Sequence, residues 1–240
     1  MIDWLRRSPA EPSITLAGRV VPVNIRRHPT ARRMTLRLAP DGSEIRLTLP
    51  RWGRTEDGLD FAASRRGWLE AQLAGVPDAA APQAGGSVFY RGEELALLWD
   101  AKAKRRPALT GAGIVLGGPE EGLAARLRRW LEAEAATLMA DDLGGYCTLI
   151  GRAAPPLRLS RAQRRWGSCA NDGTIRLNWR LIQAPDFVRR SVVAHEVAHL
   201  AHFDHSPAFH ALLGELYEGD ITAANRWLKQ HGRTLYTRFG

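Results

Sequence analysis

The sequence contains few of the residues that mark secreted or membrane-spanning proteins. Only 2 of its 240 residues are cysteine, Cys147 and Cys169, which is too few for a disulfide framework. No run of about eighteen apolar residues occurs, so no membrane span is expected. Residues 1–12 also lack the apolar stretch of a signal peptide. We therefore expect a cytoplasmic protein.

Lysine is also scarce, because only three of the 34 basic residues are lysine and the rest are arginine. The formal net charge of +9 raises the question of a nucleic-acid partner. The arginines come as scattered pairs, from Arg6-Arg7 to Arg189-Arg190, and form no compact block of five or six. Scattered pairs are more typical of a solvated surface. The charge leaves a nucleic-acid partner open, but we do not favour one.

The first half of the chain has the alternation of apolar and polar residues that is typical of half-buried strands. This alternation covers residues 13–50, and Asp41-Gly42 indicates a hairpin turn within it. A helix is expected over residues 59–74, and a loop rich in proline, alanine and glycine follows it. Further strands are expected at residues 88–90, 95–99 and 113–116. We predict a β-rich module with one helix over residues 1–118.

The second half contains longer helical patterns. The first begins at Pro119 and runs to Cys147, with Glu120 and Glu121 expected in its first turn and Gly144-Gly145 near its end. Pro185 and Asp186 are expected to open a second helix, Ser206-Pro207 a third and Asp220 a fourth. Short strands are expected at residues 157–160 and 174–179. The chain therefore predicts an α+β protein with a second domain over residues 119–240.

The most informative stretch is residues 191–210, SVVAHEVAHLAHFDHSPAFH, which holds five of the 7 histidines. His195, Glu196 and His199 form the pattern H-E-x-x-H. Residues four apart share one face of a helix, so His195 and His199 can present two imidazoles to one metal ion. Glu196 can then reach a metal-bound water without being a ligand itself. The surrounding residues are apolar, and polar groups placed there cost free energy unless they are paired or bind a metal.

A catalytic zinc site needs a third protein ligand and one open position. His205 follows His195 by ten residues and offers that ligand. Glu215 and Glu218 are alternatives, because some related sites use a downstream glutamate. We prefer His205.

Three segments of the second half resemble the YgjP-like zinc metallopeptidases, which are distantly similar to SprT-like and minigluzincin proteases. They are RRWGSC (residues 164–169), IRLNWRLIQAP (175–185) and HEVAHLAHFDHSPAF (195–209). The resemblance covers nearly all of residues 157–209. It implies a zincin-like catalytic domain in which a small sheet lies against an H-E-x-x-H active-site helix. It also implies Zn²⁺ as cofactor, His195, His199 and His205 as its ligands, and Glu196 as general base.

The mechanism that follows is hydrolysis of a peptide bond in a peptide or protein substrate. Zinc would polarise the scissile carbonyl and activate a water, whose proton Glu196 would take and pass to the leaving amine. An edge strand within residues 174–179 could align an extended substrate. Tyr217, His202 and His210 are candidate donors to the oxyanion. Candidates for substrate binding are Trp166, Gly167, Ser168, Asn178 and Tyr217.

Three points stay open in the sequence. Gly167 predicts close approach of the backbone beside the metal, with a simple packing corner as the alternative. Cys169 is interpreted as a small buried residue in preference to a thiol ligand. Two other functions compete with a peptidase of free peptides and proteins: a DNA-associated protease, and a zinc-stabilised binding module without catalysis. The intact Glu196 argues against the last, because a structural zinc site has no use for a base.

Overall fold

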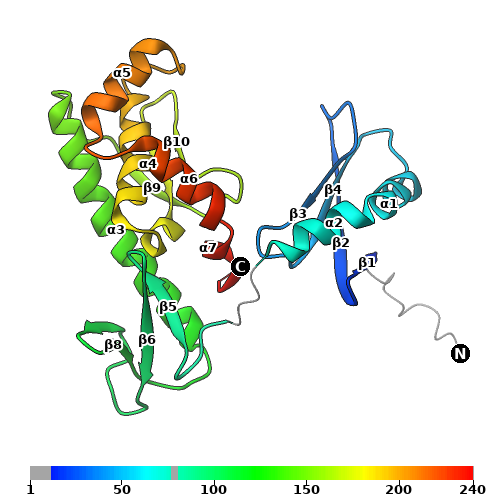
Figure 1. Cartoon of the computed structure of the whole chain (residues 1–240), viewed down its shortest axis with the longest axis horizontal. Helices are drawn as coiled ribbons and strands as arrows, with labels where there is room; N and C mark the ends of the chain where they lie inside the picture. Colours follow the sequence, from blue (N-terminus) through cyan, green and yellow to red (C-terminus); the bar gives the residue numbers. More distant parts are fainter. Residues whose placement is uncertain (1–11, 77–80, 240) are drawn as a thin grey trace, which may run out of the picture. The chain divides into compact units, whose positions relative to one another are not determined.

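The structure is a computed structural model that describes residues 12–76 and 81–239 (Figure 1). The chain forms two compact units that divide between residues 78 and 79. The predicted domain boundary after residue 118 stays a prediction. In packing terms, however, the strands between residues 87 and 116 belong with the helices that follow, because Val88, Leu97 and Ile114 share one core with Leu127 and Val197. No helix in the described part of the chain is long and apolar enough to cross a membrane.

The first unit is a four-stranded sheet with two helices on one face. Its strand order is β1-β2-β4-β3, with β2 and β4 parallel in the centre. The predicted turn at Asp41-Gly42 is confirmed, because Gly42 has a positive φ of 70° and β3 pairs antiparallel with β4. The predicted helix over residues 59–74 is two helices that break at Arg65. The elements are β1 (Ser13–Leu16), β2 (Arg19–His28), β3 (Thr35–Leu38), β4 (Ile45–Pro50), α1 (Thr55–Ser64) and α2 (Arg66–Ala74).

The second unit begins with another four-stranded sheet, in the order β5-β6-β8-β7. The tip of its first hairpin contacts the body of the unit, because the N–H groups of Arg91 and Gly92 donate to the carbonyls of Ile182 and Gln183 over 2.7 and 3.2 Å. Three of the four strands match the predicted positions, and β7 is additional. The strands are β5 (Ser87–Tyr90), β6 (Glu93–Trp99), β7 (Ala108–Thr110) and β8 (Gly113–Leu116).

The long helix α3 (Leu123–Leu149) differs from its prediction at both ends. Gly122 adopts a left-handed conformation with φ 78°, so Glu120 and Glu121 precede the helix and do not form its first turn. At the other end the helix continues through Gly144-Gly145. Each glycine costs about 1 kcal/mol in a helix, but buried residues on both sides of the pair pack into the core and carry the helix onward. Leu143, Tyr146 and Cys147 are those residues.

A three-stranded sheet lies beside the C-terminal helices. Its order is β10-β11-β9, with β10 (Gly167–Cys169) antiparallel and β9 (Leu157–Ser160) parallel to β11 (Ile175–Asn178). The predicted strand at residues 157–160 is confirmed. The prediction that residues 174–179 hold an edge strand is wrong, because β11 has partners on both sides. The remaining elements are the 3-10 helix η2 (Trp179–Gln183), α4 (Asp186–Ala198), α5 (Pro207–Leu216), α6 (Ile221–His231) and α7 (Thr234–Thr237).

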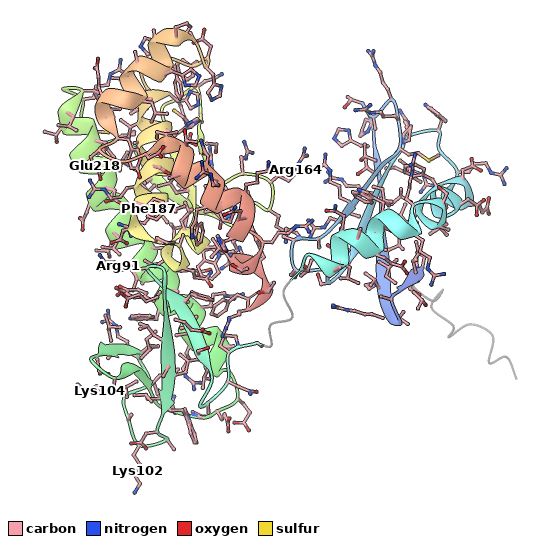
Figure 2. The ribbon with its side chains drawn as sticks, in the orientation of Figure 1. Arg91, Lys102, Lys104, Arg164, Phe187 and Glu218 are labelled. Carbon is pink, nitrogen blue, oxygen red and sulfur yellow. The ribbon has the colours of Figure 1, made fainter. Side chains whose placement is uncertain are left out.

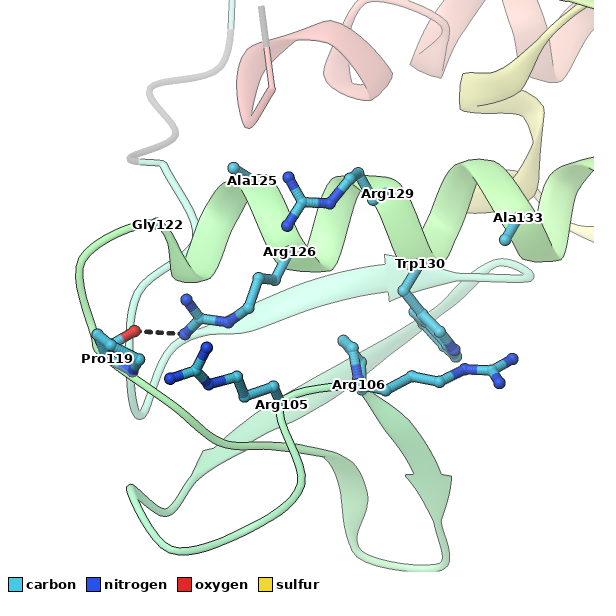
Figure 3. Close-up of a pocket in the computed structure, with 10 residues that line it drawn as sticks. Arg105, Arg106, Pro119, Gly122, Ala125, Arg126, Arg129, Trp130 and Ala133 are labelled. Atoms are coloured by element: carbon cyan, nitrogen blue, oxygen red, sulfur yellow. Dashed lines mark hydrogen bonds between the residues drawn. The ribbon is translucent and has the colours of Figure 1, made fainter.

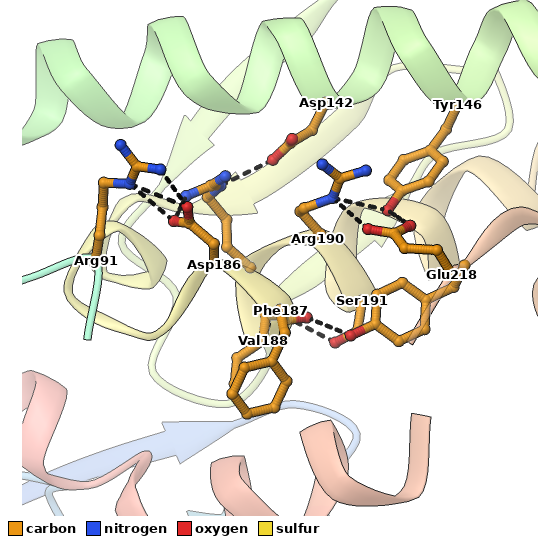
Figure 4. Close-up of polar contacts among 11 residues, drawn as sticks. Arg91, Asp142, Tyr146, Asp186, Phe187, Val188, Arg190, Ser191 and Glu218 are labelled. Carbon is orange, nitrogen blue, oxygen red and sulfur yellow. Dashed lines mark hydrogen bonds and ion pairs between the residues drawn. The ribbon is translucent and has the colours of Figure 1, made fainter. Parts of the chain in front are cut away.

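An ion pair and a hydrogen bond connect α3 with α4, between Arg189 and Asp142 and between Arg190 and Tyr146 (Figure 4). Arg189 is the most buried member, with a side chain that is 4% exposed, and its Nε lies 2.8 Å from Oδ2 of Asp142. The same guanidinium pairs with Asp186 in the first turn of α4, and Asp186 also accepts from Arg91. A buried charge requires such partners, because removing one partner leaves the other uncompensated.

We expect Arg189→Ala to lower the free energy of unfolding by about 3–5 kcal/mol, since it leaves the Asp142 carboxylate buried without its cation. Arg161→Ala is the matched control, because its partner Glu132 lies on α3, the helix that also carries Asp142. Its pair with Glu132 spans 2.9 Å, but the Arg161 side chain is 65% exposed, so the loss should be below about 1 kcal/mol. Urea denaturation of both variants is the measurement, and equal losses would contradict this account of α3–α4 packing.

Candidate metal centre

Helix α4 carries the H-E-x-x-H pattern at its C-terminal end. It begins after Pro185, as the sequence predicts, and ends at Ala198 with His199 as its C-cap. The side chains of His195 and His199 therefore lie one turn apart on the last turn of the helix. Their ring centroids are 4.8 Å apart.

The loop after α4 brings a third imidazole to the same place. This loop ends at Ser206, whose hydroxyl accepts a hydrogen bond from the N–H of Phe209 and caps α5, with Pro207 in the first turn. The cap confirms the predicted start of α5. Because the cap fixes where α5 begins, His205 is held directly before it, over the end of α4.

The three imidazoles converge on one point. Their donor nitrogens all lie within 4.8 Å of one another, and Nε2 of His205 is 3.3 Å from Nε2 of His195. Among residues 12–76 and 81–239, no other set of three histidine, cysteine or acidic side chains converges in this way. His195 and His199 are half-buried and His205 is exposed, so the cluster opens to solvent on the side of His205.

The ring of Phe209 packs against all three imidazoles. The sequence alone does not predict this contact. Its ring is fully buried and its centroid lies 5.0, 4.6 and 4.8 Å from the centroids of His195, His199 and His205. The only signal in the sequence is that Phe209 follows His205 by four residues. That spacing indicates contact only when both residues lie on a helix, and His205 lies just outside one.

The surroundings of His199 and His195 bear on how each imidazole could bind a cation. Nδ1 of His199 lies 3.0 Å from the carbonyl oxygen of His202. A carbonyl only accepts, so Nδ1 is the donor in this contact, which leaves Nε2 as the ring nitrogen that could bind a metal. Burial is the main cause that lowers the pKa of His195 to about 4, and the neighbouring imidazoles of His199, His205 and His210 contribute to the same shift. His195 is therefore neutral at physiological pH before any metal binds.

The Glu196 side chain lies beside this cluster and is 5% exposed. Burial raises the pKa of its carboxyl group to about 7, against the opposing effects of Arg165 and of the backbone N–H of Cys169. Its Oε2 atom is buried and has no hydrogen-bond partner in the structure. Burying a carboxylate oxygen without a hydrogen-bond partner costs free energy of folding. Such an atom in a native structure indicates a group that forms its hydrogen bond with a bound ligand or substrate.

Strand β10 covers Glu196 at very close range. A Cβ atom on Gly167 would lie 2.3 Å from Oε1 of Glu196, so only glycine fits at this position. The predicted close approach of the backbone at Gly167 is thus present, and the group it approaches is the Glu196 carboxylate.

Cys169 is half-buried on the same strand. Burial raises the pKa of its thiol, and nearby Glu196 raises it further. The thiol is therefore protonated at neutral pH and does not belong to the imidazole cluster.

A cavity of about 240 Å³ adjoins the cluster. His195 and Glu196 form part of its wall, and most of the rest is apolar. Trp166 and Gly167, two of the predicted substrate-binding residues, also line it. The remaining lining residues come from α4, α5 and α6, and they are Ser191, Val192, Leu213, Ile221, Asn225 and Leu228.

The structure gives other roles to two predicted substrate-binding residues. Asn178 is fully buried, and its amide donates to the carbonyl of Ala162 and the hydroxyl of Tyr236 over 2.7 and 3.0 Å. Tyr217 is buried, and its hydroxyl donates to the carbonyl of Phe187 over 2.8 Å, near the opposite end of α4 from the imidazoles. Both side chains thus make structural contacts, and neither lines the cavity beside Glu196.

The remaining predicted residues are Ser168, His202 and His210. Ser168 pairs with Arg176 in the sheet and does not line the cavity. The carbonyl of His202 holds His199, and the ring centroid of His210 lies 6.3 Å from that of His205.

The two glutamates considered as alternative ligands are not part of the cluster. Glu218 accepts from the Tyr146 hydroxyl over 2.8 Å and pairs with Arg190 over 2.7 Å, beside the first half of α4 (Figure 4). Glu215 is exposed on α5 and outside the group of converging donors. The geometry therefore favours His205 as the third donor.

Comparison with known proteins found a matching family and a similar solved structure. The model of a family described as "YgjP-like, metallopeptidase domain" matches residues 32–231. The crystal structure of the metallopeptidase zymogen of Pyrococcus abyssi abylysin is similar over 40% of this chain and 96% of that chain, with 20% identity and a TM-score of 0.36. No curated protein matches the chain. Because the family match spans most of the sequence, the chain belongs to the YgjP-like family of metallopeptidase domains.

Proposed function

We propose that this chain is a zinc-dependent peptidase of the zincin type. In this proposal His195, His199 and His205 hold the metal, and Glu196 is the general base. The observation that carries the proposal is the convergence of three imidazoles beside a buried carboxylate whose Oε2 has no partner. Membership of a metallopeptidase family supports it independently. A purely structural site would not explain the position of Glu196.

The spacing of one pair of donor atoms fits zinc. Two Zn–N bonds of about 2.0–2.1 Å at a tetrahedral angle place the two nitrogens about 3.3–3.4 Å apart. The Nε2 atoms of His195 and His205 are 3.3 Å apart. Three imidazoles with one open position are also the donor set of a catalytic zinc site, whereas structural zinc sites use four protein ligands. The solvent-facing side near His205 provides the opening.

The residues of this chain would perform the proton transfers. Zinc, when bound, supplies Lewis acidity that polarises a carbonyl and acidifies water. Glu196 would accept a proton at Oε2, the oxygen that has no partner, and deliver it to the leaving amine. A carboxyl group with a pKa near 7 is suited to both steps, because it takes and releases a proton at physiological pH.

The free edge of β10 is the proposed site for an extended peptide. In the β10–β11 pair, the carbonyl of Trp166 accepts from Asn178 and the N–H of Ala170 donates to Thr174. Alternate residues of an edge strand direct their backbone groups outward, so Gly167 and Cys169 turn theirs away from β11. Glu196 lies at this edge, since the backbone N–H of Cys169 donates to its carboxylate. A peptide paired there would pass the base and the metal site.

The competing functions stay predictions. A DNA-associated protease would show salt-dependent binding of DNA. A binding module without catalysis would keep zinc and hydrolyse nothing.

We expect His205→Ala to reduce zinc bound per chain at a limiting zinc concentration, because it removes one of three donors. Glu215→Ala and Glu218→Ala should bind zinc like wild type. Metal analysis after dialysis against a zinc buffer measures all three. Loss of zinc in a glutamate variant, with retention in His205→Ala, would contradict the proposed ligand set.

We expect Glu196→Gln to keep its zinc and to lose catalysis by about a hundredfold or more, because the amide cannot accept a proton. Gln has nearly the same size, so it should fit under Gly167. Zinc content and hydrolysis of an unfolded-protein substrate are measured on the same preparation. Undiminished hydrolysis would exclude Glu196 as the base, and loss of zinc would make it a ligand.

The apolar cavity beside Glu196 predicts a preference for a medium-sized apolar side chain next to the scissile bond. Ile221→Trp should fill the cavity and lower kcat/KM for peptides with leucine at that position by about tenfold or more relative to peptides with alanine. Thr222→Trp is the control, because Thr222 is exposed on the same helix and does not line the cavity. A cleavage assay on a peptide library measures both variants, and an unchanged preference in Ile221→Trp would contradict this role.

A further inference from the structure

A second cavity of about 650 Å³ lies at the other end of the second unit, and arginine dominates it (Figure 3). Arg105 and Arg106 reach it from the loop between β6 and β7, while Arg126 and Arg129 reach it from the first turns of α3. Figure 3 shows Arg105 and Arg126 directing their guanidinium groups toward the same region near Pro119. The other lining residues are uncharged, and they are Pro107, Pro119, Gly122, Ala125, Trp130 and Ala133.

The charge of this arginine cavity is uncompensated. No acidic residue lines it. Among the described residues, no carboxylate forms an ion pair with any of the four arginines, although nearby Arg128 and Arg161 both pair with Glu132. Two further cations, Lys102 and Lys104, extend into solvent from the loop that carries Arg105 (Figure 2). Like charges placed together repel one another, so an arrangement of this kind is stabilised by an anion.

Arg126 is held in position before any ligand arrives, and the stem of Arg105 packs against the backbone. The guanidinium of Arg126 donates to the carbonyls of Pro119 and Glu121, and its Nε is buried without a partner. The stem of Arg105 lies against the backbone of Gly118, where a Cβ would be 2.9 Å from Cγ of Arg105. Groups that are already ordered lose less conformational entropy on binding. The cavity is therefore prepared for a ligand.

The start of α3 adds to the positive potential. The cavity is lined by Gly122, directly before the helix, and by Ala125 in its first turn. The first N–H groups of a helix lack intrahelical partners, and the helix dipole places partial positive charge at this end. Anions bind readily at such termini.

This arginine cavity is separate from the candidate metal centre. It shares no lining residue with the cavity beside Glu196. Helix α3 has 27 residues, which corresponds to a length of about 40 Å. Arg126 and Arg129 lie in its first turns. Arg152, just beyond its other end, donates to the carbonyl of Leu200 next to the imidazoles.

We propose that the arginine cavity binds a compact ligand that carries two or three linked phosphate groups. A phosphate monoester carries a charge of about −1.5 to −2 at neutral pH, so linked phosphates bring a charge comparable to that of four guanidiniums. A single carboxylate brings only one charge. Guanidinium groups also match phosphate oxygens with two parallel hydrogen bonds. A nucleic-acid duplex spreads its charges along its axis, whereas these arginines line one cavity, where Arg105 and Arg126 direct their guanidinium groups toward the same region.

The proposal is tested by isothermal titration of the full-length protein with sodium tripolyphosphate, ATP and a blunt DNA duplex. Arg105→Ala/Arg129→Ala removes two lining cations. Arg164→Ala/Arg226→Ala is the matched control, because it removes two exposed arginines of the same unit that do not line the cavity. All three proteins keep the three imidazoles, so any contribution from chelation of a bound metal by the phosphates is the same in each.

We expect wild type and the control to bind tripolyphosphate alike. The cavity variant should bind at least about tenfold more weakly, since each hydrogen bond to a charged group contributes about 1.5–3 kcal/mol. Equal affinities for tripolyphosphate and ATP would assign recognition to the phosphates alone, and tighter binding of ATP would add the nucleoside. Absence of binding by wild type, equal weakening in both variants, or binding of the duplex without tripolyphosphate would overturn the proposal.

Discussion

The Glu196 carboxyl group is 5% exposed, and removing a carboxylate from water costs free energy unless a partner compensates it. This cost determines much of the surrounding structure. Helix α4 provides apolar neighbours, β10 covers one oxygen at the position of Gly167, and the other oxygen has no partner. The result is a carboxyl group with a pKa near 7 beside three imidazoles. Packing alone would not maintain so costly an arrangement, whereas proton transfer at this position would use it.

The rest of the second unit fixes α4 in place. Its first half is held by the buried pair between Arg189 and Asp142 and by contacts of Asp186 with Arg91 at the tip of the β5–β6 hairpin. Its last turn lies against Phe209 of α5. Both ends of the helix are therefore constrained by segments that are distant in the sequence. The strands β5, β6 and β8 contribute no donor to the imidazole cluster. They share a core with α3 and α4, and the hairpin they include helps to position α4.

The sequence predicts best what depends on local spacing. His195 and His199 converge because they lie four residues apart on a helix, and Ser206 caps α5 because its side chain meets a nearby N–H. Predictions that depend on distant pairing were less successful. The sequence predicts an edge strand within residues 174–179, but the position of β11 in the middle of the sheet depends on its partners at residues 157–160 and 167–169.

The sequence alone also does not predict side-chain roles that depend on tertiary contacts. Asn178 was a candidate for substrate binding, yet its amide is used by Tyr236, which is 58 residues away. Nothing local predicts the ring of Phe209 beneath the imidazoles. Gly167 is a partial success, because its residue type indicated close approach but not that the neighbour would be Glu196.

The central claim is that three imidazoles form the protein's share of a zinc site that leaves one position open. X-ray absorption at the zinc K edge of the zinc-loaded protein tests it most directly, since it counts and identifies the atoms around the metal. The account predicts three imidazole nitrogens and one oxygen at about 2.0–2.1 Å. A sulfur ligand at about 2.3 Å, which would have to come from a cysteine, or a shell with fewer than three imidazoles would contradict it.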